Sequence, residues 1–327
     1  MAEVFLVPPQ PVATGHDHAL DDFRLVERSA ELERSDFRRT ASPEAARVIL
    51  FVGSRDPLQR DVRRHTLAHR FPERVVLYDS SDRVVPFLRG IYPSACRSWY
   101  APRRMRSGHY LRWSDRDSIR YTDPEILPTH LFGFRGAVTH PIRRAILALR
   151  HDRALLADTT DELGRGFGQS ETVYREYRDR YGDELAAVRF VVSPRGAGPG
   201  SMRIFESMRA GRAPVVVSDE WVEPKGPDWP SFSLRLAERE VEQLPALLER
   251  RAGDAAEMGR RARQAWEHWF SPEASFATLS AWAMDLVAGS WRRERIDRLL
   301  VRRRLLEPRL LLRHVLGART RRLRRPS

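Results

Sequence analysis

The chain has 327 residues, of which 42% are hydrophobic and 31% charged, a balance typical of a folded protein with about two domains. Its apolar runs are shorter than the ~18 residues that a membrane-spanning helix needs. The single cysteine, Cys96, excludes an internal disulfide and a multi-cysteine zinc site. The first 15 residues show no basic region followed by an apolar stretch, so we expect no export signal and a cytoplasmic location.

The positive charge is concentrated at one end of the sequence. The formal net charge is +13, and residues 291–327 hold 14 arginines against three acidic residues. Pro308 divides this segment into 292–307 and 309–316, where leucine and arginine recur at helical spacing. The pattern predicts a basic amphipathic tail that suits an anionic membrane surface or a partner protein, and the alternative is a terminal helix packed on the body. Nucleic-acid binding is not expected, because no binding motif accompanies the charge.

The first 130 residues alternate short β-branched runs with helical stretches, which favours α/β layers. We expect strands at 4–7, 47–52 and 74–78 and helices at 19–34 and 59–70. The third strand runs into Asp79, Ser80, Ser81 and Asp82, residue types that favour turns and caps. Parallel sheets bind ligands where their strands end, so polar residues at this point are candidate contacts.

A second alternating block follows an irregular connection. Residues 97–128 are rich in Arg, Ser, Asp, Pro and Trp with weak periodicity, and we place a domain boundary near Leu127 and Pro128. In the second block we expect strands at 131–134, 154–157, 189–193 and 213–217, and helices from 141 and at 170–181, 201–210, 240–269 and 272–288. Pro141 fits the first position of its helix. Two such blocks predict two lobes with a cleft between them.

The most informative segment joins the strand at 189–193 to the helix at 201–210. The connection 195–200 contains three glycines, which let a backbone approach a ligand closely. Ser201 is expected to cap the helix. The free amides and the positive dipole end of a helix start suit a phosphate.

Two arginines and a glutamate complete this candidate phosphate site. Arg195 and Arg203 can give charge-assisted hydrogen bonds to phosphate oxygens. Glu206 lies early in the same helix, where a carboxylate can accept both hydroxyls of a ribose. The alternative for Arg203 and Glu206, three residues apart, is a surface ion pair worth only ~0.2–0.5 kcal/mol. The segment lacks both the G-x-G-x-x-G fingerprint and the G-K-[ST] P-loop, so the glycines alone do not assign the site.

The order and spacing of residues 190–229 resemble the conserved core of the exostosin family of glycosyltransferases. The matching residues are Pro194, Arg195, Gly196, Ser201, Arg203, Glu206, Ala210, Gly211, Pro214, Ser218, Asp219, Trp221, Pro224, Asp228 and Trp229. A weaker resemblance extends over about 130–245 and includes residues 132–136 and 141–143.

This resemblance implies a GT-B fold of the α/β class, in which two Rossmann-like lobes face a cleft. The expected parts are an N-terminal acceptor-binding lobe at 1–128, a nucleotide-sugar-binding lobe at 129–272, a helix at 273–290 that returns toward the first lobe, and the arginine-rich tail at 291–327. The implied reaction is an inverting transfer from a UDP- or GDP-linked sugar to a glycan or glycolipid acceptor. The resemblance implies no metal and no other cofactor. The alternatives are an inactive scaffold with the same fold and a basic protein that binds a membrane or nucleic acid.

The resemblance also assigns roles to individual residues. The nucleotide sugar is expected to contact Arg135, Arg195, Gly200, Ser201, Arg203, Glu206, Asp219 and Trp221. Arg195 is expected to act in catalysis by stabilising the charge on the departing diphosphate. Trp221 follows a strand and is placed to stack on the sugar, with packing in the core as the alternative.

Inversion requires a general base near the acceptor hydroxyl. Asp17, in the run Gly-His-Asp-His at 15–18, is the candidate that we place in the catalytic site. Asp56 and Asp79, which end the next two strands, are alternatives. Each of these carboxylates has a cap or a turn as its competing role. His16 and His18 have the spacing of a metal pair, but no third ligand is evident, so we expect no metal site.

Overall fold

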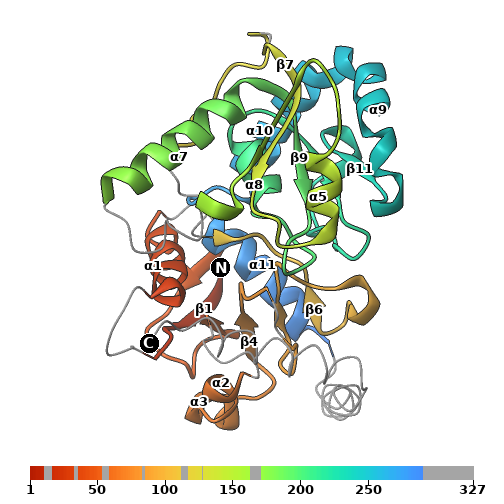
Figure 1. Ribbon diagram of the computed structural model, residues 1–327. Coiled ribbons are helices and arrows are strands. Elements are labelled where there is room, and N and C mark those ends of the chain that lie inside the picture. The colour runs from red at the N-terminus through yellow and green to blue at the C-terminus, as the bar shows by residue number, and fades with distance from the viewer. Residues whose placement is uncertain are drawn as a thin grey trace.

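In the computed structural model the chain forms two lobes, each built on a sheet of parallel strands (Figure 1). The structure describes residues 1–10, 17–32, 36–53, 59–82, 85–111, 117–126, 128–162 and 171–289. The predicted arginine-rich tail at 291–327 lies outside the described residues, as do His16 and Asp56.

The N-terminal sheet has the strand order β2-β1-β3-β4-β5-β6. Its strands are β1 (Ala2–Val7), β2 (Phe37–Arg39), β3 (Val48–Val52), β4 (Val75–Tyr78), β5 (Gly90–Ile91) and β6 (Met105–Arg106), and its first helices are α1 (His18–Ala30), α2 (Arg60–Arg63) and α3 (Thr66–Arg70). In β3, Leu50 packs into the core that contains α1, whereas Ile49 and Phe51 pack into the core beside α2 and α3. Successive side chains of a strand point to opposite faces of the sheet. Both sets of β3 side chains pack into cores that contain helices, so β3 is buried throughout and helices cover both faces of the sheet.

The C-terminal sheet has the strand order β11-β10-β9-β7-β8. Its strands are β7 (His130–Gly136), β8 (Ala154–Asp158), β9 (Val188–Pro194), β10 (Ala213–Val217) and β11 (Leu234–Leu236), and its helices are α5 (Pro141–Leu147), α7 (Glu171–Ala186), α8 (Met202–Arg209), α9 (Leu244–Arg250) and α10 (Ala255–Trp269). In β9, Phe190 and Val192 share a core with α5 and α9. Val191 points to the other face and packs with α7. Short 3₁₀ turns lie at 97–99, 229–231, 238–243 and 252–254.

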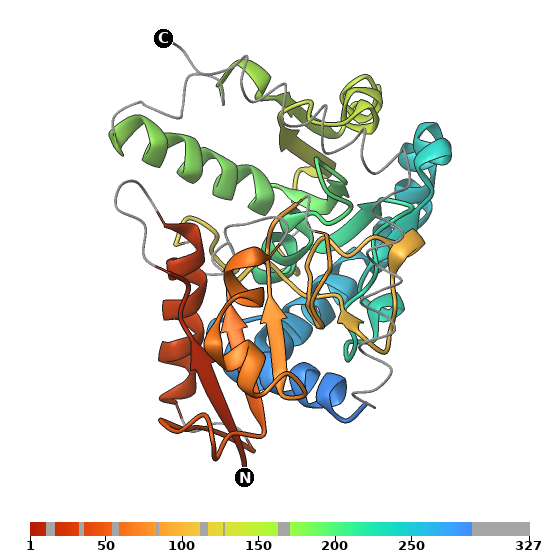
Figure 2. The same cartoon turned by 90° about the horizontal axis from the view of Figure 1, so that it is seen from below.

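Helix α11 (Ser275–Val287) follows the C-terminal lobe in sequence but packs on the N-terminal sheet, behind its strands in Figure 2. Ser29 of α1 fixes the start of α11 by two hydrogen bonds. Its hydroxyl donates to the carbonyl oxygen of Glu273 at 2.8 Å and accepts from the amide of Phe276 at 3.0 Å. Leu279 and Trp282 of α11 then fill the core against β3. The last described helix therefore joins the two lobes.

The predicted α/β class with two parallel-sheet lobes, the GT-B arrangement, is confirmed. The single helix predicted at 59–70 is wrong in detail, because the chain bends at His65 between α2 and α3. His65 Nδ1 accepts the amide of Leu67 at 3.2 Å and caps α3. Strands β2, β5, β6 and β11 were not predicted. No helix among the described residues is long and apolar enough to span a bilayer.

Candidate active site

The glycine-rich loop 195–200 lies between β9 and α8, at the edge of the sheet where β7, β9 and β10 end. It also meets the N-terminal lobe. A Cβ atom on Gly198 would lie 2.5 Å from Ser94 Oγ, and one on Gly200 would lie 2.6 Å from the carbonyl oxygen of Pro93. No side chain fits at such distances, so the close approach of the two lobes requires glycine at both positions.

Two arginine side chains lie beside this loop, at the end of β7. Nε and Nη2 of Arg203 donate to the carbonyl oxygen of Arg135 at 2.9 and 2.6 Å. Arg143, in the first turns of α5, donates to the carbonyl oxygens of Arg195 at 2.9 Å and Ala137 at 3.1 Å. Backbone oxygens at the ends of β7 and β9 therefore fix both guanidinium groups in place.

Where the structure describes the chain, Arg143 and Arg203 are not directly paired with acidic side chains. In the described ranges, neither guanidinium group forms an ion pair with a carboxylate. Burial and the nearby charge of Arg203 lower the pKa of Arg143 to about 9, so it remains protonated at neutral pH. Two positive charges beside the positive end of α8 suit an anion. We call Arg143, Arg203 and the N-terminus of α8 the anion cradle.

Ser201 occupies the N-cap position of α8, but its hydroxyl does not cap the helix. Its buried Oγ has no hydrogen-bond partner within the part of the chain that the structure describes. The predicted cap is therefore wrong, because the hydroxyl does not reach the amides of the first turn. A buried hydroxyl without a partner costs free energy, and a phosphate oxygen in the anion cradle would supply that partner.

Arg195 and Asp219 lie at the ends of β9 and β10, beside Glu238. Nη1 of Arg195 is 3.6 Å from Oε1 of Glu238. Asp219 and Glu238 exchange hydrogen bonds of 3.1 and 3.2 Å, in which the carboxylate of each accepts the backbone amide of the other. The guanidinium of Arg195 thus faces Glu238, and its carbonyl oxygen contacts the anion cradle. The nucleotide-sugar contacts of Arg195 and Asp219, and the catalytic role of Arg195, stay predictions.

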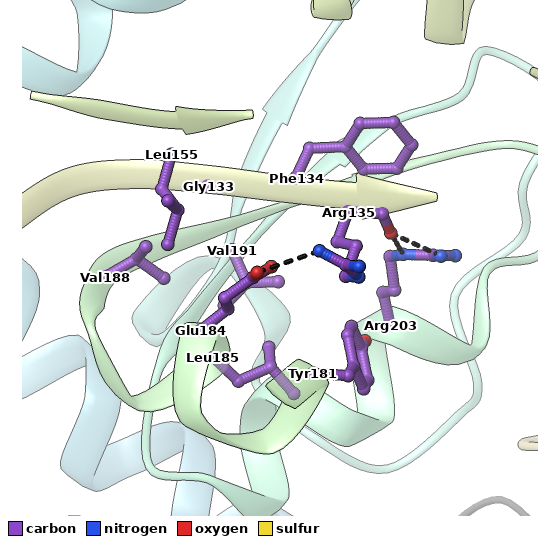
Figure 3. A pocket seen from close by; sticks show the side chains of 10 residues that line it. All are labelled: Gly133, Phe134, Arg135, Leu155, Tyr181, Glu184, Leu185, Val188, Val191 and Arg203. Atoms are coloured by element: carbon purple, nitrogen blue, oxygen red, sulfur yellow. Dashed lines mark hydrogen bonds and ion pairs between the residues drawn. The ribbon is translucent and has the colours of Figure 1, made fainter. Parts of the chain in front are cut away.

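The side chain of Arg135 points into a hollow beneath α7, away from its own carbonyl oxygen (Figure 3). The hollow measures about 280 Å³ with its open mouth included. Arg135 donates there to Glu184 and Glu162, both at 2.8 Å, and burial raises the pKa of Glu184. The guanidinium group of Arg135 therefore forms ion pairs with two carboxylates. The structure assigns Arg135 a backbone part in the site, as the acceptor for Arg203, and nucleotide binding by its side chain stays a prediction.

Glu206 lies next to the anion cradle, in the interior of α8. Its side chain is 2% exposed, and Oε2 accepts a hydrogen bond of 2.6 Å from the hydroxyl of Tyr181. The guanidinium of Arg203 stands 5.9 Å from the centre of the Tyr181 ring. Tyr181 thus connects the carboxylate to the cradle, and the predicted ribose contact of Glu206 stays a prediction.

Trp221 lies where the two lobes meet, a region that we call the seam. Its backbone pairs there with Cys96 of the N-terminal lobe in an isolated antiparallel bridge. The indole is 1% exposed and meets the ring of Trp229 edge-on, with centroids 5.1 Å apart. A buried indole presents no open face to a sugar. The structure therefore favours packing over sugar stacking for Trp221.

The N-terminal lobe contributes several carboxylates near the seam. Asp17 is the N-cap of α1, and its Oδ1 accepts the amide of Leu20 at 3.2 Å. Asp79, at the end of β4, is 1% exposed. One of its oxygens accepts the amide of Ser81 at 3.0 Å, and the other has no partner among the residues described. A base role for Asp17 stays a prediction, whereas Asp79 is closed off from any acceptor.

We expect Asp79→Asn to raise the free energy of unfolding at neutral pH. Burial raises the pKa of Asp79 from 3.8 to about 6, a difference that corresponds to about 3 kcal/mol. Because the folded-state pKa is the higher one, this contribution is fully present below pH 3.8 and is lost as the pH rises through about 6. Urea unfolding at about pH 4.5 and 7.5 checks this, with the exposed Asp152→Asn as control. A gain of equal size at both pH values would contradict the assignment.

The sequence around this site is similar to that of known proteins. The model of the exostosin GT47 domain matches residues 115–250. An exostosin-1 homolog of Caenorhabditis elegans is 37% identical over 95 residues, which are 27% of this chain and 25% of that protein. Exostosin-1 of Drosophila melanogaster is 28% identical over 156 residues, 43% of this chain and 20% of that protein. The chain thus aligns with a quarter or less of the length of these relatives.

The chain also aligns with solved structures at low sequence identity. A glycosyltransferase involved in avilamycin A biosynthesis aligns with a TM-score of 0.44 and 14% identity, covering 89% of this chain and 99% of that one. The Anabaena protein Alr3699/HepE in complex with UDP aligns with a TM-score of 0.38 and 11% identity, covering 86% and 98%.

The matched range contains the glycine-rich loop, both arginines of the anion cradle and Glu206. The resemblance found in the sequence at about 130–245 is confirmed by a match over nearly the same residues. Residues 115–250 of this chain, which include the anion cradle, therefore resemble an exostosin GT47 domain.

Proposed function

We propose that this protein is a glycosyltransferase that moves a sugar from a nucleoside-diphosphate sugar to a glycan or glycolipid acceptor. The observation that carries the proposal is the anion cradle, in which Arg143 and Arg203 face no carboxylate partner in the described ranges. A diphosphate gives these charges a partner at the positive end of α8. The match to the exostosin GT47 domain and the similarity to exostosin-1 proteins support the same class of reaction.

The cradle also suggests how the leaving group is handled. As the bond between the sugar and the diphosphate breaks, negative charge grows on the departing oxygen. Preorganised positive groups aimed at that charge stabilise the transition state. We propose that Arg143, Arg203 and the amides at the start of α8 do this without a metal, and that the sugar is transferred with inversion. The donor is proposed to be UDP- or GDP-linked, and no other cofactor takes part.

A binding screen tests the proposal. We expect one of UDP-, GDP-, ADP- and dTDP-glucose to raise the melting temperature, since a ligand at 100 times its Kd stabilises the native state by about 2.7 kcal/mol. The same mixtures are then assayed for release of the free nucleoside diphosphate. Binding without release over long incubation indicates the inactive scaffold. No shift with any nucleotide sugar, or with the free diphosphates, removes the proposal.

A further inference from the structure

A carboxylate of the N-terminal lobe lies at the rim of the anion cradle and was not among the general-base candidates drawn from the sequence. Oδ1 of Asp82, four residues past the end of β4, accepts from the hydroxyl of Tyr110 at 3.2 Å. Ser94 Oγ lies 3.4 Å from the same oxygen and is hydrogen-bonded to the Tyr110 hydroxyl at 2.8 Å. Tyr110 and Ser94 are buried, whereas Asp82 itself is exposed. The carboxylate is therefore held in one position and still open to an incoming molecule.

Contacts between the two lobes place Asp82 beside the glycine-rich loop 195–200. The carbonyl oxygen of Asp82 would lie 2.8 Å from a Cβ on Gly198. The hydroxyl of Tyr110 would lie 2.9 Å from a Cβ on Gly200. The charge of Asp82 also acts on Arg143, where it opposes the lowering of the pKa by burial. A carboxylate of the N-terminal lobe thus lies within electrostatic reach of the group assigned to the diphosphate.

The other carboxylates described on this side are less suited to meet an acceptor. Asp17 uses Oδ1 to cap α1. Asp79 and Asp22 are 1% and 0% exposed, so a hydroxyl on a glycan does not reach them. Of these four residues, only Asp82 is both exposed and in contact with the loop 195–200.

We propose that Asp82 is the general base of the transfer, an inference that rests on the proposed function. The acceptor oxygen forms its bond to the anomeric carbon as its proton passes to the Asp82 carboxylate. The bond from the anomeric carbon to the diphosphate breaks, and its electron pair leaves with the diphosphate held in the anion cradle. Tyr110 and Ser94 act as positioning residues that keep the carboxylate pointed at the seam.

The test uses Asp82→Asn and the nucleotide sugar that gives the largest thermal shift. Release of nucleoside diphosphate, with water or an added glycan as acceptor, is expected to fall ~10²–10⁴-fold, the usual contribution of a positioned base. The Kd for the donor, measured by calorimetry, is expected to remain unchanged. Asp152→Asn, an exposed aspartate of the other lobe, serves as the matched control.

The outcomes separate this inference from the proposed function. If wild-type protein neither binds nor turns over any donor, the function itself fails. If wild-type protein is active and Asp82→Asn is equally active, only the assignment of the base is overturned. A fall in activity that comes with a lower melting temperature and weaker donor binding also overturns it, because a structural role then explains the loss.

The positioning role of Tyr110 has its own readout. Tyr110→Phe is expected to lower kcat for release of the nucleoside diphosphate and to leave the Kd for the donor unchanged, with a smaller loss of rate than in Asp82→Asn. A wild-type kcat in folded Tyr110→Phe would overturn the role of Tyr110 as the residue that orients the base.

Discussion

Arg143→Ala is expected to weaken binding of the donor or of its free nucleoside diphosphate by about 100-fold. Two charge-assisted hydrogen bonds to a diphosphate, at about 1.5 kcal/mol each, account for a change of this size. Isothermal titration calorimetry with UDP or GDP measures it directly. Arg144→Ala is the matched control, since Arg144 is the next residue of α5 and its side chain is exposed.

A second substitution separates charge from geometry. Arg143 holds the carbonyl oxygens of both Arg195 and Ala137, which a single ammonium group cannot do in the same fixed fork. Arg143→Lys should therefore lose less affinity than Arg143→Ala but not recover the wild-type value. Melting temperatures show whether each variant remains folded. Wild-type affinity in a folded Arg143→Ala protein would mean that the diphosphate binds elsewhere.

The class of fold could be predicted because its central strands are buried on both faces. Runs such as 48–52 and 213–217 are apolar at every position, and such runs indicate parallel strands covered by helices. The short strands β5 and β6 could not be predicted in this way. Each has two residues, and their pairing with β4 and with one another is set by tertiary contacts rather than by a local pattern.

The candidate site was predictable to the extent that it lies in one stretch of sequence. The glycine-rich loop and α8 follow one another, so their glycines and serine could be read as a phosphate site. Arg143 could not be recognised as its partner, because 60 residues separate it from Arg203 and only the fold brings both to the end of β7. Its sequence signals are its place in the first turns of a helix that directly follows β7 and its inclusion in the weaker resemblance at 141–143. The burial of Trp221 between the lobes also depends on tertiary contacts that no local pattern contains.

His109→Phe is expected to make the protein much less sensitive to acid. His109 is fully buried. Its ring lies among the rings of Phe205 in α8, Phe270 just after α10, and Trp282 in α11, with centroids 5.2–6.4 Å away. Neither ring nitrogen has a hydrogen-bond partner among the described residues. An aromatic ring without nitrogens therefore fits this environment and removes two unsatisfied polar atoms.

The stability gained by His109→Phe relative to wild type grows as the pH falls, because burial lowers the pKa of His109 from 6.5 to about 3. The unfolded chain then binds a proton that the folded protein excludes, so this contribution to stability is present above pH 6.5 and is lost as the pH falls toward 3. At about pH 5 the loss amounts to about 2 kcal/mol, and at about pH 3 it reaches about 4 kcal/mol. The contribution of His109 to the free energy of unfolding falls as the pH falls, whereas that of Asp79 rises. The pH dependence of wild-type stability therefore includes two opposing contributions.

Urea unfolding at about pH 5 and 7.5 therefore distinguishes the two residues. His109→Phe should lose less stability than wild type between pH 7.5 and 5, and His268→Phe, at an exposed histidine of α10, should follow wild type. The double variant with Asp79→Asn should show the flattest profile of all, since both titrating groups are then absent from the cores near the seam. An unchanged acid sensitivity in His109→Phe would show that other groups control the stability of the contact between the lobes.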